Sequence, residues 1–158
     1  MCEFFSSIVT RDGRVLWHEA TDSHEILIKH FGLKEGSGAG HAAANFVRCE
    51  FTPKDGNFAD VVSYSLKIDE SETPLWLTDE LLESVINTMR EIISKMIVTD
   101  ERELLLGGKW ILAEKANVKE AISANIHVMR DSSQVGTMRE SSHVGTMLDS
   151  SQVGEKHN

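Results

Sequence analysis

The C-terminal residues 126–154 repeat with a fixed period of nine residues, which constrains the fold more tightly than any other feature of the chain. Each unit carries an aliphatic residue, a methionine and two adjacent serines, found at Ile126, Val135, Val144 and Val153, at Met129, Met138 and Met147, and at Ser132, Ser133, Ser141, Ser142, Ser150 and Ser151. The glycines and paired serines oppose helix formation, and the period is not that of a coiled coil. The repeat therefore predicts a β-solenoid, with valine and methionine inside and serines at the corners.

The length of the repeat decides what must happen at its ends. If two nine-residue units form one coil, residues 126–154 supply fewer than two coils, whereas about three repeats are usually needed for a stable stack. We expect the preceding chain to cover the first end. The last end should stay open unless the final four residues shield it or another copy stacks on it. Because an open strand edge is a template for pairing, we predict a homo-oligomer that self-associates through Val144, Met147 and Val153.

Nine-residue repeats also occur in calcium-binding β-rolls, where aspartates stand beside glycines. Here the acidic residues of the repeat, Asp131, Glu140 and Asp149, stand beside serines instead, which disfavours calcium. Among the histidines, His24 and His30 are six residues apart, whereas a zinc-binding pair on one helix face is four apart. The sequence thus predicts no metal site and no cofactor.

Residues 1–103 have the patterns of strands followed by a long helix. Strands are predicted at residues 3–10, 14–18, 45–51 and 61–68. Asp12-Gly13 is a hairpin signal between the first two strands, because a tight turn needs a positive φ that glycine adopts readily. The fourth strand alternates, and its predicted inward side chains are Val62, Tyr64, Leu66 and Ile68.

Two helices are predicted in the same part of the chain. The short one follows Asp22, which we predict as its N-cap, with Glu25 at the capping-box position and Gly32 at the C-terminal end. The long one follows the cap Thr78 and reaches about Ile97. Its apolar stripe consists of Leu82, Val85, Met89, Ile92, Ile93 and Met96.

These elements predict an α+β fold, with a small mixed or antiparallel sheet and one long helix, followed by a short C-terminal β-solenoid of nine-residue repeats. We assign residues 1–103 to the α+β globular domain, residues 104–125 to a hairpin and connecting cap, and residues 126–158 to the solenoid. The hairpin is predicted because apolar residues flank Gly107-Gly108 on both sides.

The composition limits the partners of the chain. Its 158 residues carry a formal net charge of −9 with the acids spread along the sequence, which argues against general nucleic-acid binding. No apolar run reaches the length of a membrane span, and the first residues lack the pattern of a signal peptide. The two cysteines, Cys2 and Cys49, form no CxxC pair, so we expect a reducing, cytoplasmic location.

The SSxVGxM repeats, the Met1-Cys2 start and the Asp22-Ser23-His24 sequence resemble uncharacterised proteins of phages, prophages and gut bacteria, in which a globular part runs into VGxM-type repeats. The resemblance covers both ends of the chain and is looser in the middle. It implies a β-solenoid tail and a mobile-element origin, with the host-cell cytoplasm as the location. It implies no activity and no catalytic residues.

Cys2 carries a catalytic hypothesis. If Met1 is removed, Cys2 becomes the N-terminal residue, and its thiol can act as a nucleophile with its own amine as the base. His24 and Asp22 would complete a Cys-His-Asp group if the fold brings the three together. The competing interpretation is structural: a half-buried strand cysteine, an aspartate that caps the helix, and a surface histidine in its first turn.

The sequence leads to two hypotheses about function. The first is a non-enzymatic binding and assembly protein of phage or mobile-element origin, which self-associates through its repeat tail. Its α+β domain would bind an unidentified host or phage protein. The alternative is a small cysteine-dependent enzyme with Cys2 as the N-terminal nucleophile, which a retained Met1 would rule out.

Overall fold

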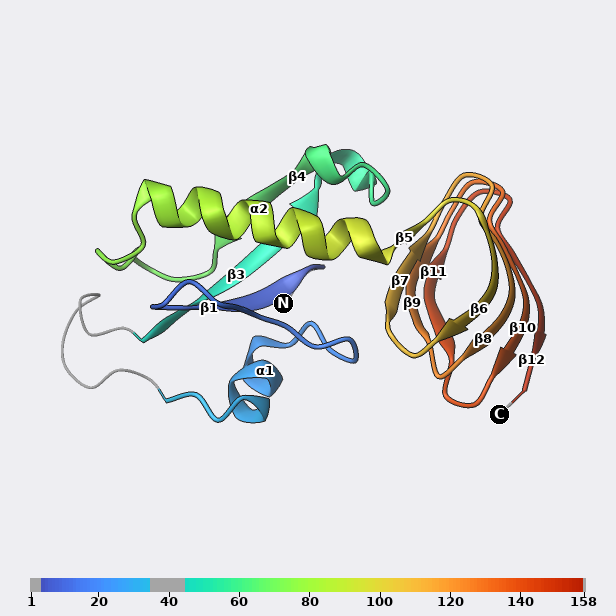
Figure 1. Cartoon of the computed structure of the whole chain (residues 1–158), viewed down its shortest axis with the longest axis horizontal. Coiled ribbons are helices and arrows are strands. Elements are labelled where there is room, and N and C mark those ends of the chain that lie inside the picture. Colours follow the sequence, from blue (N-terminus) through green and yellow to red (C-terminus); the bar gives the residue numbers. More distant parts are fainter. Residues whose placement is uncertain (1–3, 35–44, 158) are drawn as a thin grey trace. The chain divides into compact units, whose positions relative to one another are not determined.

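The computed structural model describes residues 4–34 and 45–157, and the chain divides into two compact units, Met1–Ile92 and Ile93–Asn158. The first unit contains an antiparallel sheet with the helix α1 and most of the helix α2, and the second contains a parallel β-solenoid (Figure 1). The predicted fold class is therefore confirmed. The division lies before the predicted boundary at residue 103, because the solenoid begins earlier than its visible repeats.

The sheet of the first unit has the strand order β2-β1-β3-β4, and each neighbouring pair is antiparallel. Its strands are β1 (Ser6–Thr10), β2 (Val15–Leu16), β3 (Phe46–Pro53) and β4 (Tyr64–Ile68). The β1–β2 hairpin turns at Gly13, whose φ is 84°, as the sequence predicts. The 3-10 helices η2 (Lys54–Gly56) and η3 (Val61–Ser63) connect β3 to β4, and η3 leaves Val62 exposed rather than inward.

Helix α1 (His24–His30) is capped differently from the prediction. Ser23, not Asp22, is the N-cap, and its side chain accepts a backbone hydrogen bond from the first turn. Asp22 Oδ1 instead accepts a hydrogen bond from the backbone N–H of Ser6 at 3.0 Å, which ties the start of α1 to β1. Gly32 follows the helix with a φ of 63°, as expected for a residue that ends it.

Helix α2 (Asp79–Met96) confirms the predicted long helix. Thr78 caps it, since Thr78 Oγ1 accepts a hydrogen bond from the backbone N–H of Leu81 at 3.2 Å. The buried members of its predicted apolar stripe are Val85, Met89, Ile93 and Met96, and the half-buried members are Leu82 and Ile92.

Strand β3 presents alternate side chains to opposite faces of the sheet, and Figure 1 shows α1 and α2 on opposite sides of it. Phe46 packs with Leu27 of α1, so α1 covers one face. Phe51 lies on the other face, where its ring stacks on Tyr64 with centroids 5.3 Å apart. Glu50 has the same parity as Phe46 and therefore faces α1.

The second unit is a solenoid of about four coils, each built from two short strands. One sheet has the order β12-β10-β8-β6 and the other β11-β9-β7-β5, with parallel neighbours in both (Figure 1). The strands are β5 (Ile97–Val98), β6 (Glu101–Leu106), β7 (Lys109–Leu112), β8 (Asn117–Ile122), β9 (Asn125–Met129), β10 (Gln134–Arg139), β11 (His143–Met147) and β12 (Gln152–Lys156). Val135 pairs with Val153 and Ile126 with Val144, eighteen residues apart in each case, so two nine-residue units form one coil.

The predicted hairpin and connecting cap at residues 104–125 is wrong. Strand β6 pairs with β8, and β7 pairs with β5 and β9, all in parallel, so β6 and β7 lie in different sheets. Gly107 and Gly108, with φ values of 60° and 79°, form a corner between the sheets. These early coils carry no Ser-Ser or Val-Gly pair, and β6 is offset from β8 by sixteen residues, so no regular period marks them in the sequence.

The core of the solenoid is one apolar cluster that runs through the coils. It contains the repeat residues Ile126, Met129, Val135 and Met138, together with Val98, Leu105, Leu112, Ala116, Val118, Ala121 and Ala124. Trp110 packs against it from β7. For these four repeat residues, the prediction that valine and methionine positions line the interior is confirmed.

Serines and acidic residues hold the corners. Ser142 Oγ accepts a hydrogen bond from the backbone N–H of Ala124 at 3.0 Å and donates one to the carbonyl oxygen of Ala121 at 3.1 Å. Asp131 and Asp149 adopt left-handed φ values of 57° and 56°. Asp149 Oδ2 accepts a hydrogen bond from the backbone N–H of Asp131 at 3.1 Å, so the repeated acids join successive coils.

Gly136, the repeat glycine of β10, is required by the close approach of two coils. A Cβ atom there would lie 2.8 Å from the carbonyl oxygen of Lys119 on β8. We expect Gly136→Ala to lower the free energy of unfolding by about 1–3 kcal/mol, because the backbone must shift to admit the methyl group. Urea denaturation measures the change, with the exposed corner variant Ser141→Ala as the control. Unchanged stability of Gly136→Ala would contradict this role.

Candidate self-association site on the last coil

The last coil of the solenoid consists of β11 and β12, which are the outermost strands of their sheets. Strand β11 pairs with β9, and β12 pairs with β10. Within residues 4–34 and 45–157, no strand pairs with the outer edge of either one. Backbone N–H and C=O groups along such edges can pair with the strand of another chain.

Methionine and valine positions that are buried in the preceding coil become more exposed in the last coil. Met129 is fully buried, whereas Met147, its register partner one coil later, is 45% exposed. Val135 is 1% exposed, whereas its partner Val153 is half-buried, as is Val144. Val144, Met147 and Val153, the residues that the sequence analysis selects, thus form an apolar surface at the end of the solenoid, which we call the terminal face.

Charged residues end the interior columns of the solenoid. Lys156 is the register partner of Met138 and so occupies an interior methionine position on the last coil. Arg102 occupies an interior valine position on the first coil, opposite Val118. Polar residues at the terminal repeats are typical of stacked architectures. On the last coil the shielding is partial, because Met147 of the same coil stays exposed.

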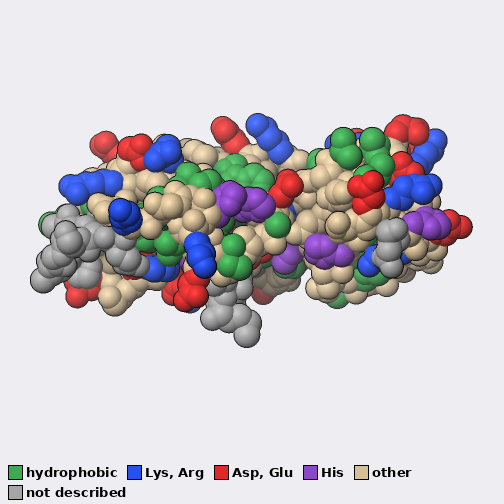
Figure 2. All heavy atoms as spheres, turned by 90° about the horizontal axis from the view of Figure 1, so that it is seen from below, with side chains coloured by type: hydrophobic (Ala, Val, Ile, Leu, Met, Phe, Trp, Pro, Cys, Tyr) green, Lys and Arg blue, Asp and Glu red, His purple; other side chains and the backbone are tan. Residues whose placement is uncertain are grey.

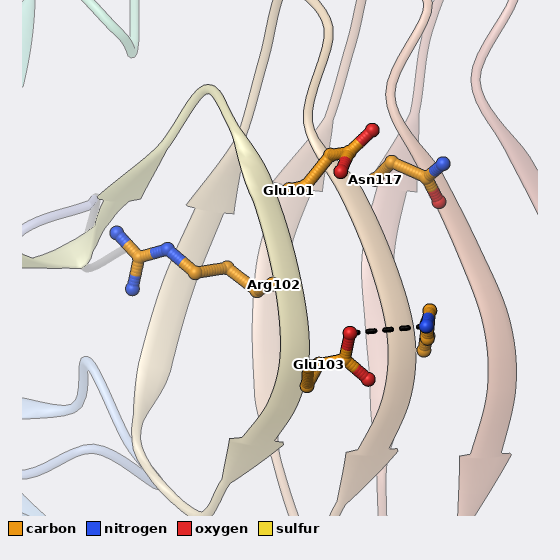
Figure 3. Close-up of a pocket in the computed structure, with 5 residues that line it drawn as sticks. Glu101, Arg102, Glu103 and Asn117 are labelled. Atoms are coloured by element: carbon orange, nitrogen blue, oxygen red, sulfur yellow. Dashed lines mark ion pairs between the residues drawn. The ribbon is translucent and has the colours of Figure 1, made fainter.

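The first end of the solenoid has a different chemistry from the last. Its outer strand β6 carries Glu101, Arg102 and Glu103 in succession. Figure 3 shows Glu101 and Glu103 on one side of β6 and Arg102 on the other, in a polar pocket where Glu103 pairs with Lys119 at 3.0 Å. Charged side chains on an edge strand oppose pairing with another strand. The outer strand β11 of the last coil carries no Asp, Glu, Lys or Arg and bears the exposed Met147, so the last coil is the better candidate for association.

Of the three residues in the catalytic hypothesis, Asp22 and His24 contact different backbone groups. Cys2 lies outside the described residues, so its role stays a prediction. The Asp22 carboxylate binds the backbone of Ser6, whereas Nε2 of His24 lies 2.8 Å from the carbonyl oxygen of Cys49. His24 is 3% exposed, so the expectation of a surface histidine is wrong. The reason is that α1 packs its first residue against β3, a contact that the sequence pattern does not reveal.

Cys49 is the second cysteine, and its environment makes the thiol unreactive. Burial, with the nearby negative charge of Glu70, raises the pKa of Cys49 to about 12. The thiolate is the reactive form, so it is scarce until the pH approaches that value. In a Cys2→Ser variant at pH 8, we expect no reaction with a disulfide reagent such as DTNB until the chain is unfolded. Rapid labelling of the folded variant would contradict this expectation.

The charge distribution bears on the classes of partner. Figure 2 shows acidic and basic side chains interspersed over the face that it draws. This pattern differs from the clustered lysines and arginines of a phosphate-binding surface. In the part of the chain that the structure describes, no helix combines the length and apolar character needed to cross a membrane.

Comparisons with protein-family models, with curated proteins and with solved structures found no match. Within the described residues, the terminal face combines unpaired strand edges with partly exposed apolar side chains, which are the features of a surface that binds another chain.

Proposed function

We propose that this chain is a non-enzymatic binding and assembly protein that self-associates end to end through the last coil of its solenoid. The observation that carries the proposal is the contrast between Met129, which is fully buried, and Met147, which is 45% exposed at the equivalent position. A second copy placed on the terminal face would bury Met147 as β11 buries Met129. Burial of an apolar side chain of this size contributes roughly 1.5–3 kcal/mol.

Two-fold symmetry fits the two ends of the solenoid better than a head-to-tail filament. A two-fold axis across the terminal face places each outer strand antiparallel to an outer strand of the second copy, so both edges are paired. A head-to-tail contact would instead set the terminal face against β6, with its run of Glu101, Arg102 and Glu103. Isologous contacts of this kind close on themselves and give a dimer.

The first unit is then free to bind a partner, and its sheet with α1 and α2 supplies the surface for it. The resemblance of the repeats to those of phage and prophage proteins supports a mobile-element origin and an action in the host-cell cytoplasm. A host or phage protein is the partner that we propose for this unit. Binding of such a partner by the first unit does not depend on self-association, because the terminal face belongs to the second unit.

Light scattering coupled to size-exclusion chromatography tests the self-association. We expect the full-length chain to elute with twice its monomer mass at micromolar concentration, and to dissociate on dilution. A monomer mass over the whole concentration range would contradict the proposal. A mass that rises without limit would indicate a filament and would contradict the two-fold arrangement.

A further inference from the structure

Three side chains that are far apart in the sequence meet between α1 and the sheet. His24 begins α1, Glu50 lies on β3 and Asp69 directly follows β4. Each offers one potential ligand atom, and these three atoms lie within 4.8 Å of one another. His24 and Glu50 are each 3% exposed, whereas the Asp69 side chain is 51% exposed. The three residues, which we call the His24 cluster, are thus buried on the inner side and open to solvent at Asp69.

The backbone fixes which ring nitrogen of His24 faces the carboxylates. Nε2 lies 2.8 Å from the carbonyl oxygen of Cys49, and a carbonyl oxygen only accepts, so Nε2 carries the hydrogen. In the neutral ring, Nδ1 then has a lone pair, and it lies 3.8 Å from Asp69 Oδ2. Histidine ligands of metals are commonly held in this way, with one N–H donated to a backbone carbonyl and the other nitrogen directed at the ion.

A further acidic residue, Asp22, is held near Glu50 by the β1–β3 register. Glu50 lies opposite Ser6 in the β1–β3 register, and Ser6 donates its backbone N–H to the Asp22 carboxylate. A third carboxylate therefore approaches the same part of the sheet. Buried carboxylates are costly unless a cation or hydrogen-bond donors compensate their charge.

Two cationic side chains are carried near the cluster by β3 and β4. Arg48 Nη1 pairs with Glu70 Oε1 at 2.7 Å, which neutralises its charge. Lys67 lies opposite Glu50 in the β3–β4 register, but its side chain is exposed and forms no ion pair with any residue that the structure describes. Asp69 is held in place by its backbone N–H, which donates to the carbonyl oxygen of Arg48 at 2.8 Å.

We propose that His24, Glu50 and Asp69 bind one divalent cation, through Nδ1 of the histidine and one oxygen from each carboxylate. A mixed set of one imidazole and two carboxylates suits Mn²⁺, Fe²⁺ or Zn²⁺ better than Ca²⁺, which prefers oxygen ligands throughout. Neighbouring ligands of a six-coordinate ion lie roughly 3 Å apart, so the cluster must contract slightly on binding. The exposed side chain of Asp69 can make that movement and marks the path of entry. Water fills the remaining positions around the ion.

No spacing motif in the sequence marks this site. Its three residues lie on a helix, on a strand and on the connection after another strand, and they meet only through the β1–β3–β4 register and the packing of α1. The proposed site therefore departs from the sequence-based expectation of no metal site, because that expectation rests on ligand spacing and these three residues show no such spacing. The site is independent of the terminal face, since all its residues belong to the first unit.

Titration of the full-length chain with Mn²⁺, followed by the electron paramagnetic resonance signal of the free ion, tests the site. We expect one Mn²⁺ bound per chain and a raised melting temperature in its presence. Asp69→Asn should weaken the affinity at least tenfold. Because Asp69 is half exposed, this variant should fold even if the buried substitutions His24→Ala and Glu50→Gln do not, and circular dichroism verifies the fold.

A second pair of histidines provides the matched control. The rings of His18 and His30 have centroids 4.7 Å apart, and such a pair can bind a metal by itself. The double variant His18→Ala/His30→Ala should bind Mn²⁺ as the natural chain does. Loss of binding in this double variant, equal binding by Asp69→Asn, or no binding by the natural chain at millimolar Mn²⁺ would each overturn the assignment.

Discussion

Met147→Asp is expected to convert the self-associated chain into a monomer and so to halve the mass measured in solution. Met147 belongs to the terminal face, where the proposed second copy would bury it. In the dimer, each introduced carboxylate would lose water at a contact that buries an apolar side chain in the natural chain. A penalty of about 3 kcal/mol corresponds to a roughly hundredfold increase in Kd. The monomer itself should keep its stability, since the side chain is already 45% exposed there.

Sedimentation equilibrium of the two proteins at equal concentration measures this change. Gln134→Asp is the matched control, because it adds the same charge at an exposed position one coil earlier on β10, outside the terminal face. This control should remain a dimer. A dimer that survives Met147→Asp would refute the end-to-end contact, and dissociation of both variants would show that added negative charge alone opposes association.

The C-terminal coils are predictable because an aliphatic residue, a methionine and paired serines recur at fixed positions in each unit. Val135 and Met138 occupy positions that recur with the nine-residue period, and the structure buries both. The first coils are not predictable in this way. Their interior positions hold Arg102, Leu105 and Ala121, and the offset between strands shortens to sixteen residues. The parallel stacking persists in these coils although the sequence period disappears.

The terminal face could be predicted although the number of coils could not. The nine-residue period picks out Val144, Met147 and Val153, and the structure leaves Met147 exposed and the two valines half-buried. The number of coils depends on the early ones, which the repeat does not mark, so the repeat alone underestimates it. The His24 cluster is harder to predict from the sequence. Ser23 rather than Asp22 is the N-cap, so α1 begins at His24, and the strand register then brings Glu50 close to it. Both depend on competition between local hydrogen bonds and tertiary packing.

Met129→Ala is expected to destabilise the solenoid by about 2–5 kcal/mol, because it leaves a cavity in the core that neighbouring coils fill only in part. The equivalent change Met147→Ala removes the same atoms from the same repeat position one coil later. In the monomer it should cost under about 1 kcal/mol, since little apolar surface returns to water. Because both variants remove the same atoms, the difference between their losses of stability measures the effect of the coil in which the methionine lies.

Tryptophan fluorescence reports on the solenoid if Trp17 and Trp76 are replaced by phenylalanine, because Trp110 packs against the solenoid core and is then the remaining tryptophan. Urea denaturation of this background with each alanine change gives the two free energies, measured where the chain is monomeric. Equal losses from Met129→Ala and Met147→Ala would mean that the last coil is covered within one chain, which would contradict the open end. At concentrations that favour the dimer, the loss from Met147→Ala should grow, because the second copy then buries the side chain as β11 buries Met129.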